Sequence, residues 1–253
     1  MPLVFSDEIK NLYKGQMNVY LVEIEKHAME FENRFSSKLI SQKNRPERLL
    51  GHNGMAFLLK LLTRTLHIID GTIVSINNSN TTMAFLGVRA QIETTGAISC
   101  LHKWLTKFYN KECTYDELDE RLKRLFLGIK TFPHENSSNP NGKLEPISVM
   151  TLIDDIDSAC KKIGIKQKKP FRGIYNFLSE FCHPNFFGIS IASSVNEKGV
   201  LDYQYPPKIN QNELDEIAFS LAFSSKLFLM LYDECFNSLT KNEETPILEK
   251  RNN

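Results

Sequence analysis

Apolar side chains recur at intervals of three and four residues along most of this chain, which is the spacing of amphipathic helices. The spacing predicts a first helix from Ser6 to about Gln42. "NRP" then interrupts the pattern, and a second helix is predicted from Pro46 to about Ile76. A third helix is predicted from Thr82 to Tyr109, and a shorter fourth one ends near Leu127. Four helices therefore account for the first half of the chain.

The second half continues with helices separated by clear turn signals. Thr114 followed by Glu117 is typical of a capping box, which marks the start of the fourth helix. The segment Lys130–Pro146 is rich in Asn, Pro, Ser and Gly and is predicted to be a surface loop. A fifth helix is predicted over Ser148–Ile163, and a sixth ends near His183.

Strands are predicted at one place only. Apolar and polar residues alternate on both sides of "NEKG", which predicts a β-hairpin over about residues 187–206. The last helix, from about Asn210 to Leu239, is apolar on nearly every side around Ala218–Leu231, so we expect it at the centre of the fold. The pattern as a whole predicts an all-α bundle of about seven helices in one domain, residues 1–240, followed by a flexible charged tail, residues 241–253.

Composition narrows the class of protein. The 253 residues include 31 Lys and Arg against 30 Asp and Glu, so overall charge does not indicate nucleic-acid or membrane binding across the whole surface. The five cysteines lie far apart without a CxxC pair, as in proteins that keep reduced thiols. No stretch of about 18 residues is apolar and uncharged. We therefore expect a cytoplasmic protein that does not span a membrane.

Several classes of site are missing from the sequence. It contains no Walker loop, no GxGxxG, no GxSxG, no HExxH and no zinc-finger spacing. We accordingly predict neither a cofactor nor a bound metal.

The stretch "YNFLSEFCHPNFFG" places His183 where the sixth helix must end, because Pro184 follows it. One interpretation is a general acid or base, or a phosphate contact, since imidazole titrates near neutral pH. The other is a packed histidine that caps the helix through its last carbonyl groups. Both interpretations stay open at this point.

Arg89 and Glu93 are isolated charges on the otherwise uncharged stretch Thr81–Leu101, so we expect them to point inward or into a groove. They form either an ion pair within the helix or a site in which the Arg89 guanidinium binds phosphate. Gly87 and Gly96 on the same helix either allow another helix to approach closely or weaken the helix.

Two motifs carry a resemblance to a known group of proteins. These are "R-A-x-x-E" at Arg89–Glu93 and "Y-x-x-L-S-x-x-x-H-P" at Tyr175–Pro184, followed by the hairpin and the apolar terminal helix. Together they resemble an uncharacterised family of mostly bacterial all-helical proteins that are distant relatives of the HEPN domains. HEPN proteins commonly form homodimers, and many are metal-independent ribonucleases of toxin–antitoxin and phage-defence systems.

The resemblance implies a catalytic site with two principal residues. His183 would move a proton at the ribose 2′-hydroxyl and Arg89 would bind the phosphate, while Glu93, Tyr175, Ser179 and Asn185 would line the cleft. RNA would be the substrate, and an antitoxin or another protein would be a partner.

Two further hypotheses compete with the ribonuclease. One is a non-catalytic protein-interaction module in which Arg89, Glu93 and His183 form a structural polar network. The other is a small-ligand pocket surrounded by Tyr175 and Phe181 together with Phe186. A homodimer fits any of these hypotheses, because apolar residues occupy several faces of the first two predicted helices.

Overall fold

A computed structural model describes residues 4–12, 18–40, 50–128, 145–191, 193–205, 208–241 and 247–249. This part of the chain forms an all-α bundle with a small hairpin, which confirms the predicted fold class. The helices are α1 (Asp7–Leu12), α2 (Asn18–Arg34), α3 (Leu50–Asn77), α4 (Thr81–Tyr109), α5 (Tyr115–Leu127), α6 (Val149–Lys162), α7 (Pro170–Cys182), α8 (Phe186–Ser190) and α9 (Gln211–Thr240). The strands are β1 (Lys38–Ile40), β2 (Ser193–Val195), β3 (Leu201–Tyr203) and β4 (Ile247–Glu249).

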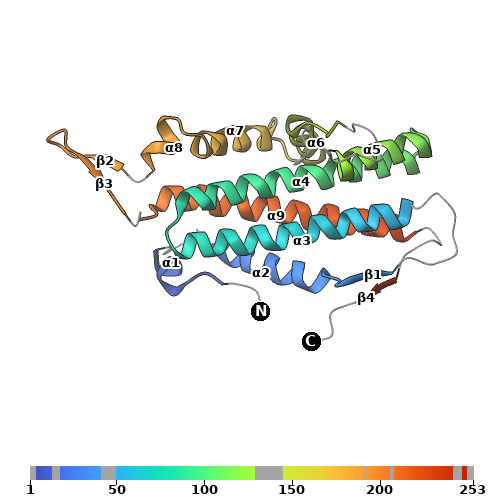
Figure 1. The fold of residues 1–253 in the computed structure, drawn as a ribbon, viewed down its shortest axis with the longest axis horizontal. Helices are drawn as coiled ribbons and strands as arrows, with labels where there is room; N and C mark the ends of the chain where they lie inside the picture. The colour runs from blue at the N-terminus through green and yellow to red at the C-terminus, as the bar shows by residue number, and fades with distance from the viewer. Residues whose placement is uncertain are drawn as a thin grey trace, which may run out of the picture.

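Helices α4 and α9 form the middle of the bundle, as Figure 1 shows. Helix α3 packs against both of them, α2 packs against α9, and α6 and α7 cover the other side of α4. The core contains fully buried aromatic side chains from α2, α4, α7 and α9, namely Phe31, Phe85, Phe171 and Phe228. The central position predicted for the apolar last helix is therefore confirmed.

Helix starts follow the sequence signals closely. The Thr114 side chain accepts a hydrogen bond from the Glu117 amide, and the Glu117 carboxylate accepts one from the Thr114 amide, so the predicted capping box is present. Asn210 and Glu213 form a second capping box at the start of α9. Because these contacts join residues three positions apart, local sequence is enough to predict them.

The first predicted helix is wrong in its extent. Helix α2 ends at Arg34, well before Gln42, and Lys38–Ile40 form β1, which pairs antiparallel with β4. The expectation that the hairpin would contain the only strands is therefore also wrong. Because β1 and β4 are about 200 residues apart in sequence, local periodicity carries no signal for their pairing.

The predicted hairpin is present, but shorter than expected. Strands β2 and β3 pair with Val195 opposite Leu201 and Ser193 opposite Tyr203. The short helix α8 occupies the residues before β2, because Asn185 caps its first turn. The hairpin projects beyond the ends of the helices (Figure 1).

Two contacts fix the helices that surround the candidate site. A methyl group added at Gly96 of α4 would lie 3.0 Å from the carbonyl oxygen of Leu152 in α6, so this glycine allows close helix contact, one of the two predicted possibilities. At the start of α7, the Asp157 carboxylate of α6 accepts hydrogen bonds from the amides of Phe171 and Arg172, at 2.8 and 3.2 Å. Helix α6 thus holds both α4 and α7. Most of the predicted loop Lys130–Pro146 lies outside the described residues.

Candidate functional site

Three of the predicted site residues meet between α4 and α7. The Tyr175 hydroxyl accepts hydrogen bonds from Nε and Nη2 of Arg89, at 3.1 and 2.8 Å. The same hydroxyl donates to Oε1 of Glu93 at 2.9 Å, and Nε of Arg89 lies 3.4 Å from that oxygen. We call Arg89, Glu93 and Tyr175 the α4–α7 network. Its residues are 82 to 86 positions apart across the two helices.

The spacing of the side chains explains why they meet. Arg89 and Glu93 are one helical turn apart and therefore lie on the same face of α4. Tyr175 is buried on the face of α7 that packs against α4. Burial raises the pKa of the Tyr175 hydroxyl, so this group stays protonated at neutral pH and can donate to Glu93.

Cys182 adds a thiol to one side of the network. The positive charge of the Arg89 guanidinium acts on this thiol. Burial raises the pKa of the Cys182 thiol, although the positive charge of Arg89 acts in the opposite direction. The thiol is thus a neutral neighbour of the network at physiological pH.

The other predicted site residues have local partners. The Ser179 hydroxyl donates to the Tyr175 carbonyl at 2.7 Å, within α7. Asn185 accepts from the Gly188 amide at 3.1 Å and donates to the Glu180 carboxylate at 2.7 Å. Both contacts stabilise the end of α7 and the start of α8.

His183 is the C-cap residue of α7, and its amide donates to the Ser179 carbonyl at 3.2 Å. The residue is exposed, and its imidazole makes no hydrogen bond or ion pair within the described part of the chain. The structure thus brings Arg89, Glu93 and Tyr175 together, but records no contact between His183 and Arg89.

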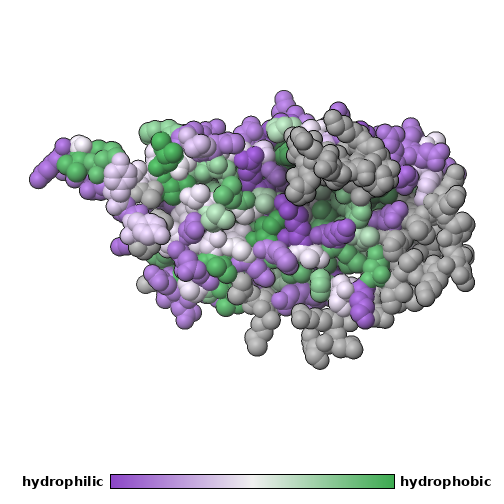
Figure 2. All heavy atoms as spheres, viewed as in Figure 1, coloured by the Kyte–Doolittle hydropathy of each residue, from purple (hydrophilic) through white to green (hydrophobic). Residues whose placement is uncertain are grey.

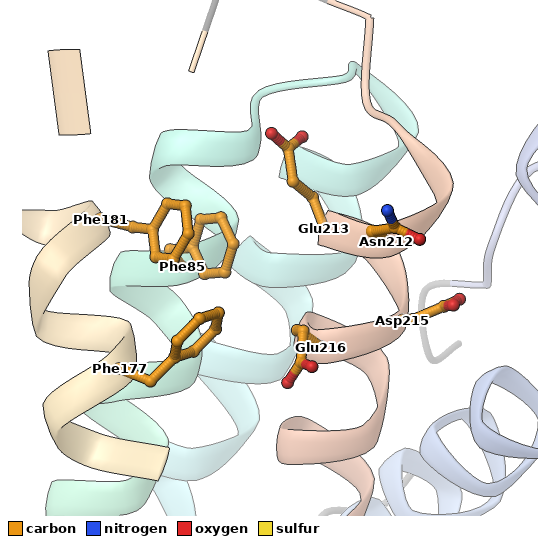
Figure 3. Close-up of a pocket in the computed structure, with 7 residues that line it drawn as sticks. All are labelled: Phe85, Phe177, Phe181, Asn212, Glu213, Asp215 and Glu216. Atoms are coloured by element: carbon orange, nitrogen blue, oxygen red, sulfur yellow. The ribbon is translucent and has the colours of Figure 1, made fainter. Parts of the chain in front are cut away.

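A pocket of 310 Å³ lies between α4, α7 and the start of α9 (Figure 3). Three phenylalanine rings form one side. The Phe85 ring of α4 stacks on the Phe181 ring of α7 with centroids 4.3 Å apart, and Phe177 meets Phe181 edge to face at 5.0 Å. The opposite side comes from the first turns of α9 and consists of Asn212, Glu213, Asp215 and Glu216.

The predicted aromatic pocket differs from this one in composition. Phe181 lines the pocket, whereas Tyr175 and Phe186 are absent from its lining. Sequence reasoning missed the carboxylates of α9. The sequence offered one local signal for the two walls of this pocket. Phe177 and Phe181 are four residues apart and Glu213 and Glu216 are three apart, so each pair shares one face of its helix.

The end of the molecule that carries α8 and the hairpin exposes many large apolar side chains. Phe186 is 75% exposed and Tyr203 is 78% exposed. We call the following set the apolar end: Phe186, Phe187, Ile189, Val195, Leu201 and Tyr203. Figure 2 shows hydrophobic residues on the projecting hairpin and on the neighbouring surface. Exposed apolar side chains that gather at one end of a molecule are typical of interaction sites.

Other properties of the described residues bear on the class of protein. None of their helices combines the length and the apolar content required to cross a membrane. No group of three His, Cys, Asp or Glu side chains among them is arranged to hold a metal ion. The fold and the site thus define an all-helical bundle with a polar network between α4 and α7. No protein-family model, curated protein or solved structure matches this chain.

Proposed function

We propose that this protein is a non-catalytic helical module that binds a protein partner through the apolar end. The observation that carries this proposal is the α4–α7 network, in which the Arg89 guanidinium is already bound by Tyr175 and Glu93 of the same chain. Such a network stabilises the position of α7, and α7 leads directly into α8 and the hairpin.

The charges of the network also favour a structural role. Arg89 and Glu93 contribute one positive and one negative charge, and their side chains are only 23% and 29% exposed. A phosphate group approaching Arg89 would meet the Glu93 carboxylate at the same place, so the electrostatic attraction would largely cancel. It would also have to compete with the Tyr175 hydroxyl for the guanidinium.

The partner that we propose for the apolar end is a second copy of this chain. Val195, Leu201 and Tyr203 share one face of a two-stranded hairpin, and within the described residues no third strand covers either edge. An isolated two-stranded hairpin is marginally stable in water, so a neighbour that covers it is expected. A twofold axis would bring the same face and edge of both copies together. The net charge of +1 adds little repulsion between them.

Sedimentation velocity of the purified chain over a range of concentrations tests this proposal. We expect a dimer for the wild type and a monomer for the double variant Phe186→Ser/Tyr203→Ser, with an unchanged helical circular-dichroism spectrum because both side chains are exposed. The matched control is Val22→Ser, since Val22 is also an exposed apolar residue but lies on α2. A monomeric wild type would contradict this role of the apolar end. Equal weakening of the dimer by the double variant and by Val22→Ser would contradict it as well.

A second candidate function is metal-independent RNA cleavage. One observation favours it: the exposed His183 directly follows Cys182, and the positive charge of Arg89 acts on the Cys182 thiol. In this mechanism His183 transfers the proton of the ribose 2′-hydroxyl and Arg89 leaves Tyr175 to bind the phosphate. A phage-defence or toxin effector with an antitoxin partner would fit this chemistry.

Incubating a mixed RNA pool with the protein in EDTA separates the two candidates. The interaction module predicts no cleavage by the wild type, together with a lowered melting temperature for Arg89→Ala. The ribonuclease predicts cleavage that is lost in both His183→Ala and Arg89→Ala, while both variants keep the wild-type melting temperature. His67→Ala, which removes another exposed histidine, is the control for the imidazole.

A further inference from the structure

The pocket between α4, α7 and α9 has one aromatic wall and one acidic wall. Phe177 and Phe181 present aromatic surface from α7, and the buried Phe85 ring of α4 stacks on Phe181 behind them. Glu213 and Glu216 extend from α9 on the side of these rings, whereas Asp215 points away from them (Figure 3). The pocket therefore offers π-electron density on one side and carboxylate charge on the other.

Only one of the two facing carboxylates has a structural function. Glu213 closes the capping box of α9 by accepting a hydrogen bond from the Asn210 amide. Burial raises the pKa of the Glu213 carboxyl group, so a positive neighbour would stabilise its charged form. Glu216 lies nearly one turn further along α9, beyond the cap, and has no ion pair within the described part of the chain.

The chemistry of the walls indicates which ligand fits. No lysine, arginine or histidine lines the pocket, so an anion would meet only carboxylates and rings. A metal ion requires several oxygen ligands around it, which three phenylalanine rings cannot supply. A cation that carries alkyl groups interacts favourably with both walls, because ring faces attract cations and also cover apolar carbon.

We propose that this pocket binds an alkylammonium group, with the rings of Phe177 and Phe181 against its carbon atoms and Glu216 next to its charge. A volume of 310 Å³ is at the small end of ligand pockets, which suits a head group better than a large molecule. The group can come from a free amine or from a lysine side chain of another protein. Binding at the pocket does not depend on the second copy proposed above.

An NMR titration with tetramethylammonium chloride, followed through the ring resonances of Phe177 and Phe181, tests the proposal. We expect saturable binding with a Kd on the order of millimolar, as befits a ligand of very few atoms. Neopentyl alcohol, which is neutral and similar in size, is expected to bind about tenfold more weakly. Sodium chloride at the same ionic strength is the salt control. Equal binding of the alcohol, or no saturable shift, would overturn the proposal.

Single substitutions test whether Glu216 itself, rather than the general negative charge of this region, attracts the cation. Glu216→Gln is expected to weaken tetramethylammonium binding about fivefold. Glu197→Gln is the matched control, because Glu197 is an exposed glutamate in the turn between β2 and β3 and does not line the pocket. Equal weakening by both substitutions would refute a specific role of Glu216. Phe177→Leu keeps apolar bulk without the ring and is expected to cost about threefold.

Two further titrations distinguish the sources of the alkylammonium group. A free amine predicts that spermidine shifts the same resonances at lower concentration than tetramethylammonium. A protein side chain predicts binding of a short peptide with one lysine and none of its alanine counterpart. The Phe186→Ser/Tyr203→Ser variant should bind tetramethylammonium like the wild type, so failure of the dimer proposal is separable from failure of this one.

Discussion

Replacing Tyr175 by Phe tests directly whether the α4–α7 network holds the two helices together. The substitution keeps the buried ring and removes only the hydroxyl, which accepts two hydrogen bonds from Arg89 and donates one to Glu93. Among the described residues, no other side-chain oxygen of α7 forms a hydrogen bond with Arg89 or Glu93.

The expected loss of stability follows from these contacts. Hydrogen bonds to charged groups contribute about 1.5–3 kcal/mol each, but the three bonds share one hydroxyl and do not add. Arg89 and Glu93 are partly exposed, so water replaces some of the lost contacts, and their direct contact at 3.4 Å remains. We therefore expect a loss of about 2 kcal/mol in the free energy of unfolding. For a chain of this length, that lowers the melting temperature by about 4–8 °C.

Urea denaturation and thermal melting, both followed by circular dichroism at neutral pH, measure this loss. Tyr205→Phe is the control, because Tyr205 is 97% exposed, lies outside the apolar end, and its hydroxyl makes no hydrogen bond within the described residues. A loss below about 0.5 kcal/mol for Tyr175→Phe would refute the structural interpretation of the network. It would also mean that the Arg89 guanidinium is readily available to a ligand, as the ribonuclease hypothesis requires.

Three further predictions follow from the described residues. Burial lowers the pKa of His27, so the unfolded chain binds a proton at this residue more readily than the folded chain. The contribution of His27 to the free energy of unfolding is therefore fully present above pH about 6.5 and decreases as the pH falls. His27→Gln should reduce the difference in stability between pH 7 and pH 5, measured by urea denaturation. Gly96→Ala should lower the melting temperature, because the added methyl group would collide with Leu152. Gly71→Ala, which has open space around it, should raise the free energy of unfolding by up to about 1 kcal/mol. Equal effects of the two substitutions would contradict the close contact between α4 and α6. Ellman's reagent should react with at most two thiols before denaturation and with five afterwards, since burial raises the pKa of Cys100 and Cys160 to about 12 and that of Cys235 well above its usual value. Rapid reaction of all five in the folded protein would contradict that burial.

Local signals explain how much of the fold was predictable. The capping boxes at Thr114 and Asn210 place two helix starts, because the contacts that stabilise them join neighbouring residues. The pairing of β1 with β4 left no local trace, and α8 was missed because five residues are too few for a periodic pattern.

The candidate site divides in the same way. Isolated charges on an apolar helix indicated that Arg89 and Glu93 have partners, since buried charge requires compensation. The sequence did not identify Tyr175 as the residue that joins them, because this depends on how α7 lies against α4. The catalytic roles of His183 and Arg89 stay predictions.

By itself, the sequence determined the class of fold, most of the helix boundaries and the residues from which a site can be built. All of these depend on the spacing of apolar side chains and on short-range hydrogen bonds. Only the tertiary structure decided that Glu216 faces Phe177 and that Arg89 is bound by Tyr175. The reason is physical: such contacts depend on the packing of helices that are far apart in the sequence, and no local pattern specifies that packing.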